Sequence, residues 1–221
     1  MLSGAGRADR AQRALESVRE RLVKSDASLI LLLTPPFNVE QPSPGYIRGY
    51  IPGVRENGGQ YTQAAIWYAM ACAQHGDADN AARALQMINP ISHSSDAAGV
   101  ARYRAEPYVI AADVYGQAPH LGRGGWSWYT GSAGWMYRAT IESLLGVILR
   151  LNRLYLAPKL PSTWPGFDVR LVHRGTRFDI AVRRDVSQLG ICFDGEPLSS
   201  PQDGIALPED GLDHQITLSV A

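Results

Sequence analysis

The stretch that decides the fold is Phe167-Asp168-Val169-Arg170-Leu171, followed by Phe178-Asp179-Ile180-Ala181-Val182. In each run, bulky apolar residues stand at every second position. Because successive side chains of a β-strand point to opposite faces, this period of two predicts strands with one buried face. Ile216, Leu218 and Val220 repeat the pattern, and Asp194-Gly195 is typical of a hairpin turn. The C-terminal part of the chain is therefore predicted to be an all-β module.

The preceding sequence has the spacing of helices instead. Ala8, Ala11, Leu15, Val18 and Leu22 recur at steps of three and four, which predicts one face of an amphipathic helix. The same kind of pattern predicts further helices over 60–74, with Gly76 as a stop, over a segment that Asp77 caps and Asn89-Pro90 ends, over 106–115, and over 132–149. The fold class predicted is mostly α with a β tail.

Composition limits the function classes. The 221 residues include 45% hydrophobic residues, enough to bury a core, and 21 basic residues balance 21 acidic ones. A neutral chain has no global field to attract nucleic acid or anionic lipid, so we expect a neutral partner. The aliphatic run from Leu29 to Leu33 is too short to span a membrane, and no secretory signal precedes it. Cys72 and Cys192 lack a metal spacing and predict reduced core residues in a cytoplasmic protein.

Three loop segments, 49–63, 105–108 and 119–135, hold most of the unusual residues. In the third, glycines allow close approach of the backbone to a ligand, and a helix that begins near Ser132 adds unpaired amides beside the Thr130 hydroxyl. These features suit phosphate. Trp126, Trp128 and Tyr129 offer flat faces that stack on a sugar ring. Phosphate beside sugar indicates phosphorolysis of a glycoside; the structural alternative is a turn that packs Trp126 and Trp128 into the core.

The remaining polar residues are less informative. Glu56 and Glu106 each suit either a site or a helix cap, and His120 is the histidine that lies in one of the three segments. His75 and His93 are predicted to be surface loop residues, and His173 and His214 belong to the β module. No metal-ligand spacing and no Ser/His/Asp set is recognisable, so we expect neither a metal nor a cofactor.

At these segments the sequence resembles glycoside hydrolase family 94. The resemblance rests on Tyr-Ile-Pro-Gly-Val-Arg-Glu-Asn-Gly-Gly-Gln-Tyr-Thr from Tyr50, Arg-Tyr-Arg-Ala-Glu-Pro-Tyr-Val from Arg102, and Gly-Arg-Gly-Gly-Trp-Ser-Trp-Tyr-Thr-Gly-Ser-Ala-Gly-Trp-Met-Tyr-Arg from Gly122. It runs from Ser3 into the β tail and is greatest for the C-terminal regions of cyclic β-1,2-glucan synthases and of the disaccharide and oligoglucan phosphorylases. It implies the last helices of an (α/α)6 barrel over residues 1–155 and a small antiparallel β domain over residues 156–221.

The resemblance also implies chemistry. In the family's inverting phosphorylases, phosphate attacks the anomeric carbon while an aspartic acid protonates the leaving oxygen. That aspartic acid is expected upstream of Met1, so no residue of this chain is assigned as catalytic and the chain alone is expected to be inactive. The implied phosphate ligands are Thr130, Gly131 and Gln63, which stands where the family usually has histidine and, unlike histidine, cannot carry a positive charge.

The expected substrate-binding residues come from all three segments: Arg55, Glu56, Glu106, Tyr108, His120, Trp126 and Trp128. The expected partners are a β-glucan or oligosaccharide, inorganic phosphate as co-substrate, and the missing N-terminal part of the same enzyme. Such an enzyme would be cytoplasmic, or the cytosolic part of an inner-membrane-associated synthase. Two alternatives to a glucan synthase remain open: a fragment of a β-glucoside phosphorylase, and a non-catalytic sugar-binding remnant.

Overall fold

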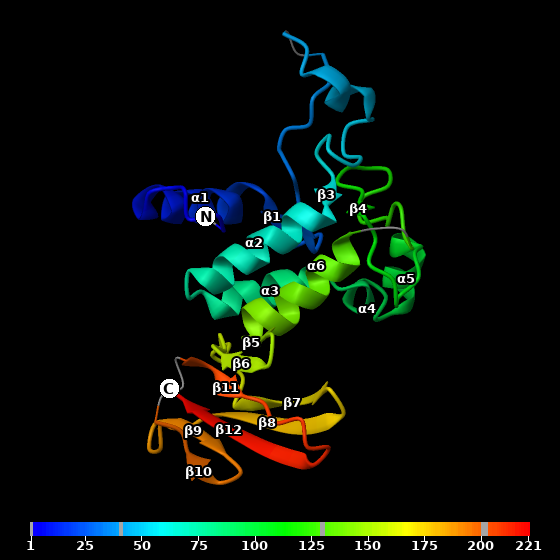
Figure 1. The fold of residues 1–221 in the computed structure, drawn as a ribbon. Helices are drawn as coiled ribbons and strands as arrows, with labels where there is room; N and C mark the ends of the chain where they lie inside the picture. Colours follow the sequence, from blue (N-terminus) through cyan, green and yellow to red (C-terminus); the bar gives the residue numbers. More distant parts are fainter. Residues whose placement is uncertain (1, 40–41, 129–130, 200–202) are drawn as a thin grey trace. The chain divides into compact units, whose positions relative to one another are not determined.

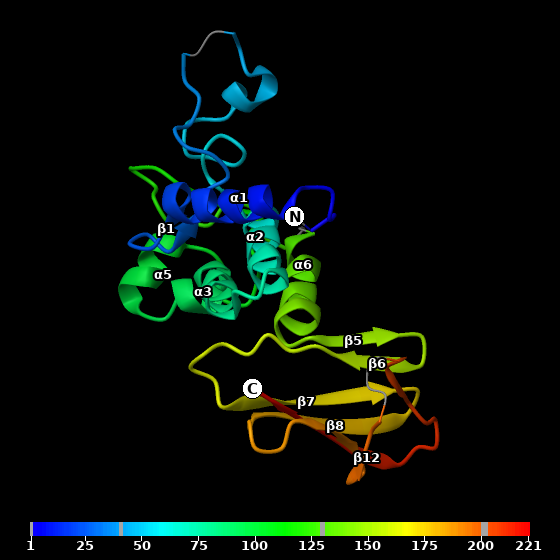
Figure 2. The same ribbon diagram turned by 90° about the vertical axis from the view of Figure 1, so that its left-hand side faces the viewer.

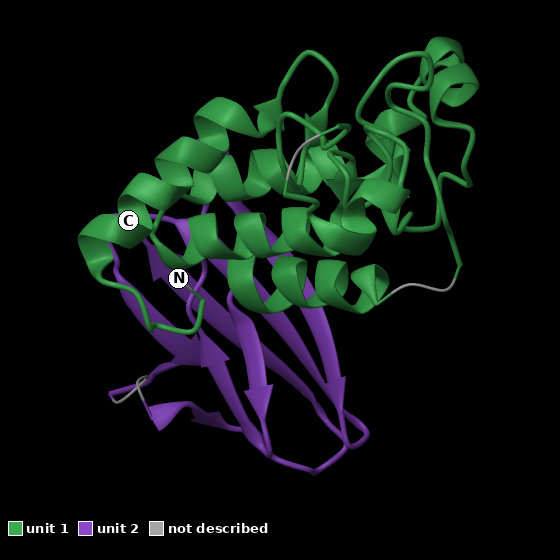
Figure 3. Cartoon of the chain, turned by 90° about the horizontal axis from the view of Figure 1, so that it is seen from above, with its two compact units in different colours: residues 1–144 green, residues 145–221 purple. Residues whose placement is uncertain are grey.

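The chain folds into a helical unit, residues 1–144, and a β unit, residues 145–221 (Figure 3). The structure, a computed structural model, describes residues 2–39, 42–128, 131–199 and 203–221. The predicted order of helices followed by strands is confirmed. The units divide after Leu144 because the hairpin β5 (Val147–Arg150) and β6 (Arg153–Leu156) pairs onward with β11 (Ile205–Ala206) in the β unit. The predicted boundary between residues 155 and 156 stays a prediction.

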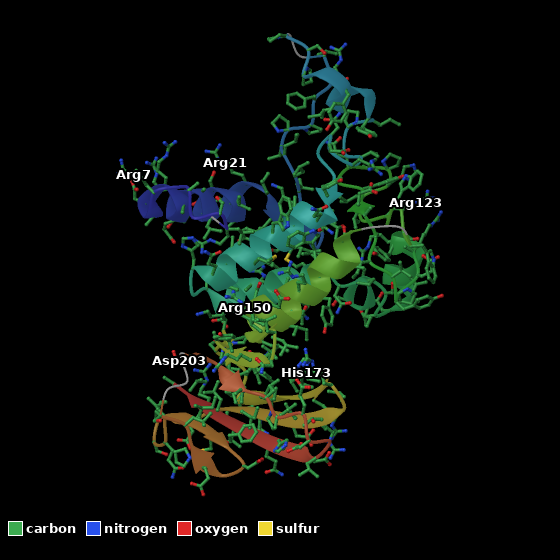
Figure 4. The ribbon with its side chains drawn as sticks, viewed as in Figure 1. Arg7, Arg21, Arg123, Arg150, His173 and Asp203 are labelled. Carbon is green, nitrogen blue, oxygen red and sulfur yellow. The ribbon has the colours of Figure 1, made fainter. Side chains whose placement is uncertain are left out.

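The first helix, α1 (Ala8–Arg21), has the predicted bounds within one residue and buries Ala11 and Leu15 on one face. The side chains of Arg7 and Arg21 lie at its two ends (Figure 4). A short ladder follows, in which β1 (Val23–Lys24) pairs with β2 (Leu29–Ile30), and the proline-rich loop beyond it contains a 3₁₀ turn over Gly45–Gly49.

The centre of the helical unit is the hairpin of α2 (Thr62–Gln74) and α3 (Ala78–Ile88). Small side chains on the buried face of α2, including Ala65, Ala69 and Ala73, allow close packing. The turn follows the prediction: Gly76 adopts φ +81°, and the Asp77 carboxylate accepts the Asn80 N–H at 3.1 Å. The helix begins at Thr62 rather than Gln60, because Gln60 and Tyr61 form β3, which pairs with β4 (Asp113–Val114).

After α3 come two short helices, α4 (Pro90–His93) and α5 (Ala97–Tyr103), which the sequence pattern did not indicate. The helix predicted over residues 106–115 is wrong. The backbone of this segment bonds to residues farther along the chain instead: Ala112 N–H donates to Trp126 O at 2.6 Å, and Tyr115 N–H donates to Arg123 O at 2.8 Å. These bonds and the β3–β4 pairing override the local helical pattern.

The last helix, α6 (Ser132–Arg138), continues as a π-helical turn over Ala139–Leu144 and ends there, five residues before the predicted end at 149. Gly146 stops it with φ +65°, and Ala157 N–H then donates to Gly146 O at 2.9 Å. Figures 1 and 2 both show α2 and α6 side by side and running in the same direction.

The β unit contains a five-stranded sheet in addition to the three-stranded one. Its order is β10 (Glu196–Pro197), β9 (Gly190–Phe193), β12 (Asp213–Val220), β8 (Thr176–Arg184), β7 (Gly166–His173). The alternation is confirmed, since Phe178, Ile180, Val182 and Ile216 are each at most 1% exposed. Asp194-Gly195 forms the predicted turn between β9 and β10, with φ of +49° and +84°.

The sheet is mixed, so the prediction of a wholly antiparallel β domain is wrong. Strand β12 lies between β8 and β9 and runs parallel to β8, with Ile216 opposite Ile180. Parallel neighbours need a long connection, and residues 185–212 between β8 and β12 supply it. An alternating pattern determines which face of a strand is buried, and it contains no information on strand direction.

Candidate functional site

The loop from Gly53 to Gly59 is held by one buried side chain. Asn57 is fully buried, and its carboxamide accepts the Phe37 N–H at 2.7 Å while it donates to Phe37 O at 2.9 Å and to Tyr50 O at 2.8 Å. The three bonds tie this loop to the proline-rich segment before it. Asn57 therefore satisfies backbone groups that would otherwise be buried without partners.

Arg55 and Glu56 stand side by side in this loop. Arg55 has φ +49°, and its Nε lies 3.6 Å from Glu56 Oε2. The guanidinium also lies 5.6 Å from the centroid of the Tyr50 ring. Burial lowers the pKa of Arg55, but the charges of Asp113 and Glu56 outweigh it and the pKa is raised. Arg55 is therefore a cation whose charge is stabilised by the carboxylates of Asp113 and Glu56.

Glu106, Tyr108 and Trp128 come together as one exposed group, which we call the aromatic platform. Glu106 accepts a hydrogen bond from Trp128 Nε1 at 2.9 Å and one from the Ser127 hydroxyl at 3.0 Å. The bond from Trp128 and then that from Ser127 lower the pKa of Glu106. The Tyr108 and Trp128 rings meet edge to face with centroids 6.2 Å apart, and both side chains are more than two-thirds exposed. The platform presents aromatic faces beside a fixed carboxylate.

Two glycines of the third segment form backbone hydrogen bonds within the helical unit. Gly124 N–H donates to Tyr103 O at 2.7 Å and Gly125 N–H donates to Asp113 O at 2.8 Å, so these amides do not point at a ligand. A Cβ on Gly125 would lie 2.3 Å from Asp113 Oδ1. Arg123 belongs to the same loop (Figure 4). The expectation that glycine amides of this segment cradle an anion is wrong for Gly124 and Gly125.

Of the predicted phosphate ligands, Thr130 lies outside the described residues, as does Tyr129 of the predicted sugar-stacking aromatics. Gly131 precedes the first turn of α6 and is exposed, and Gln63 is half-buried in the first turn of α2. The rings of Trp67 and Trp135 meet edge to face with centroids 5.6 Å apart. Each tryptophan lies four residues after one of the two predicted ligands, so in these parallel helices Gln63 and Gly131 lie at similar heights.

Trp126 and His120, two further predicted sugar-binding residues, lie in different surroundings. Trp126 is 57% exposed, so the structural alternative of a buried Trp126 is wrong, and Trp128 is likewise exposed. His120 ends the exposed turn from Gln117, and its imidazole lies edge to face with the Tyr115 ring, with centroids 6.3 Å apart. His93, predicted on the surface, is buried and stacks on Tyr103 with centroids 4.8 Å apart, because α4 and α5 enclose it.

Sequence reasoning missed Asp113. It is fully buried in β4, and burial raises its pKa, against the opposing effects of the Trp126 N–H and the Arg55 cation. One signal was available, since Asp113 is the single charged residue in the apolar run from Val109 to Val114. A lone carboxylate in such a run indicates a buried charge with a specific partner.

The described residues contain no group of three or more histidine, cysteine, aspartate or glutamate side chains placed to hold a metal ion. Among them there is also no helix with the length and hydropathy that crossing a membrane requires.

Comparison with known proteins gives two family matches. The glycosyl hydrolase 94 superfamily catalytic domain matches residues 1–146, and the glycosyl hydrolase family 65 C-terminal domain matches residues 149–199. Cyclic β-(1,2)-glucan synthase NdvB of Rhizobium meliloti (strain 1021) is 45% identical over 204 residues, which are 92% of this chain and 7% of NdvB. Solabiose phosphorylase of Paenibacillus borealis is 28% identical, over 100% of this chain and 28% of that protein.

N,N'-diacetylchitobiose phosphorylase of Vibrio furnissii is 30% identical, over 99% of this chain and 27% of that protein. The chain thus spans 7% to 28% of the length of these relatives. The first family match covers 146 of the 221 residues and includes all three loop segments that carry the candidate site. The chain therefore belongs to the glycosyl hydrolase 94 superfamily.

Proposed function

We propose that this chain supplies the substrate-side wall of the active site in a β-glucan-acting enzyme of the cyclic β-1,2-glucan synthase type. The reaction is glucan transfer and cyclisation, or inverting phosphorolysis. The similarity to the glucan synthase over 92% of the chain supports this substrate class. The general acid would lie in another part of such an enzyme, as the family resemblance implies.

The aromatic platform is the observation that carries the proposal. A glucose ring has apolar faces of axial C–H bonds and an equatorial rim of hydroxyls. The exposed rings of Tyr108 and Trp128 offer apolar surface to such a face, and Glu106 accepts hydrogen bonds from hydroxyls. The bonds from Ser127 and Trp128 fix the carboxylate before a sugar arrives, which reduces the entropy lost on binding.

Phosphate binding at Gln63, Thr130 and Gly131 forms the second part of the proposal. Gln63 and Gly131 lie at similar heights at the beginning of parallel helices, where the positive ends of the helix dipoles favour an anion. Gln63 would donate a neutral hydrogen bond to phosphate. Arg55, Glu56, Trp126 and His120 would contact the sugar around the platform.

The helices are consistent with part of an (α/α)6 barrel. Such a barrel has an inner ring of mutually parallel helices, each joined by a hairpin to an outer helix. Here α2 and α6 run in the same direction, and α3 returns antiparallel to α2. We propose that residues 1–155 belong to this barrel and residues 156–221 to the following β domain.

A β-glucoside phosphorylase is the second candidate function. It is favoured by the similarity of the whole chain to solabiose and diacetylchitobiose phosphorylases at 28–30% identity. The two candidates differ in acceptor size, since a synthase wall would bind long β-1,2-linked glucans and a phosphorylase wall a disaccharide. A non-catalytic sugar-binding remnant would bind sugar without phosphate.

The test is a titration of the purified chain with β-1,2-linked gluco-oligosaccharides of two to twenty units, followed by tryptophan fluorescence, with and without phosphate. Trp128→Ala and Glu106→Gln should each weaken sugar binding by roughly 3- to 10-fold. Tyr137→Ala is the matched control, since Tyr137 is also exposed but lies on α6. Equal affinity in all four proteins, or no binding by any, would refute the proposed sugar site. The purified chain should show no turnover with phosphate.

A further inference from the structure

Asp113 is buried behind the residues that we assign to the sugar. It pairs with Tyr61 in the β3–β4 ladder, and Oδ1 accepts the Trp126 N–H at 3.3 Å. Gly125 packs so closely on the carboxylate that a Cβ there would lie 2.6 Å from Cγ. The Asp113 carboxylate thus packs against Gly125 and bonds to the backbone of Trp126.

Three buried polar atoms share this region. Within the described part of the chain, Asp113 Oδ2, Arg55 Nε and Glu56 Oε2 have no hydrogen-bond partner. Their charges are nevertheless coupled, because the Asp113 and Glu56 charges both raise the pKa of Arg55. The Arg55 cation therefore interacts with the charges of two carboxylates, and one buried oxygen of each has no hydrogen-bond partner among the described residues.

A carboxylate in this position is costly for folding. Burial raises the pKa of Asp113, and an aspartate whose pKa is higher in the folded state destabilises the fold once it is ionised. Asparagine has nearly the same shape, can still accept the Trp126 N–H, and avoids this cost. A buried charge with this cost is expected where the charge has a task other than stability.

We propose that Asp113 is a positioning residue. It orients Arg55 and Glu56 on one side and the Trp126 backbone on the other, so that the two loops contact the same sugar. The inference rests on the proposed sugar site and assigns Asp113 no contact with substrate. Asp113 pairs with Tyr61, which follows the loop of Arg55 and Glu56, and its carboxylate accepts the N–H of Trp126 in the other loop. One buried charge thereby aligns the two halves of the site.

Asp113→Asn in the purified chain is the first test, with sophorose (β-1,2-linked diglucose) as the probe. We expect sugar affinity to fall by roughly 10-fold, because a charge-assisted arrangement is lost. The melting temperature should stay within about 2 °C of the parent or rise. Asp77→Asn is the matched control: it also removes a charge from a carboxylate that accepts a backbone N–H, but at the cap of α3. It should change neither affinity nor stability, since asparagine caps helices well.

Gly125→Ala tests the same point without changing any charge. Its methyl group must displace the Asp113 carboxylate, so affinity should fall by a similar factor. Gly134→Ala is its control, because a Cβ at Gly134 meets no atom within 4 Å. Affinity equal to that of the parent in both Asp113→Asn and Gly125→Ala, with lower melting temperatures, would show a structural role and overturn the inference.

A third measurement separates this inference from the proposed function. The exchange of the Arg55 Nε–H with water, observed by NMR without sugar, should be at least about 10-fold faster in Asp113→Asn, because the side chain is no longer held. If the parent chain binds no sophorose, the proposed function is refuted. The exchange rate of the Arg55 Nε–H then tests the positioning role of Asp113 by itself. Faster exchange would then support the positioning of Arg55, and an unchanged rate would overturn it.

Discussion

The five-stranded sheet of the β unit and the β3–β4 region of the helical unit show two different relations between sequence and structure. In the sheet, alternating residues such as Phe178, Ile180 and Val182 are buried as the local pattern predicts. Between Glu106 and Tyr115, a largely apolar segment with a helical pattern forms a turn at residues 107–108 and the short strand β4 instead. The sheet is stabilised by one continuous apolar face, whereas the site region is stabilised by particular hydrogen bonds between distant loops.

The difference teaches where a single substitution does most harm. Removing apolar volume from the sheet should unfold the β unit, because each buried side chain contacts the same core. Removing one polar side chain from the site region should release a loop, since a few groups such as Asn57 and Asp113 hold the loops there.

The largest expected effect is that of Phe178→Ala. Phe178 is fully buried in β8, and truncation of a buried phenylalanine costs about 3–5 kcal/mol. Denaturant unfolding, followed by circular dichroism, should show this loss. Val172→Ala, on the exposed side of the neighbouring β7, should change stability by less than about 0.5 kcal/mol. A similar loss in both variants would break the assignment of buried and exposed faces.

A smaller effect is expected for Asn57→Ala in the site region. It removes three hydrogen bonds and leaves the Phe37 N–H and two carbonyl groups without their partner, at a cost of roughly 2–3 kcal/mol. Limited proteolysis should then cut within residues 37–59, while the β unit stays resistant. Asn152→Ala, at an exposed turn, serves as the control. Uniform proteolysis of both units would contradict a local role for Asn57.

The smallest effect is the pH dependence of the β unit through His214. Its ring lies 2.7 Å from Asp194 Oδ2 and 3.2 Å from Asp210, and the bond to Asp194 is the main cause of its raised pKa. A histidine with a raised folded pKa contributes stability that is fully present below about pH 6.5 and is lost as pH rises through the folded value. The melting temperature should therefore fall on the alkaline side.

His214→Gln should make the melting temperature less dependent on pH. The substitution changes no other titratable side chain. Melting of both proteins at intervals from pH 5 to pH 9 measures the difference. Parallel curves for the two proteins would exclude His214 as the titrating group. The result refines the comparison of the sheet with the site region. It shows whether a polar cluster adds stability to a sheet that apolar burial already stabilises.

Much of the fold could be predicted from local pattern. The bounds of α1, the cap at Asp77, the stop at Gly76 and the Asp194-Gly195 turn all follow from residues within a few positions of one another. The direction of β12 and the end of the last helix at Leu144 could not be predicted in this way. Both depend on which distant strand accepts the backbone: β8 in one case, and the β5–β6 hairpin in the other.

For the candidate site, the residue types were predicted and their geometry was not. The segments around Arg55, Glu106 and Trp128 were singled out from their unusual composition, and Glu106 and Trp128 do meet, at 2.9 Å. Their roles as sugar and phosphate ligands stay predictions. The apolar run around Asp113 marks it as a buried charge, but its partners Arg55 and Trp126 are distant in the sequence and only the tertiary structure identifies them.

The sequence by itself determined the family, through the motifs of its three loop segments, and the division into helices and strands, through short-range spacing. Only the tertiary structure decided that Gly124 and Gly125 donate to backbone carbonyls of the helical unit, that residues 106–115 form no helix, and that the buried Asp113 interacts with the charge of Arg55. Those features depend on backbone hydrogen bonds and charges between residues up to about sixty positions apart, and no local pattern encodes such pairs.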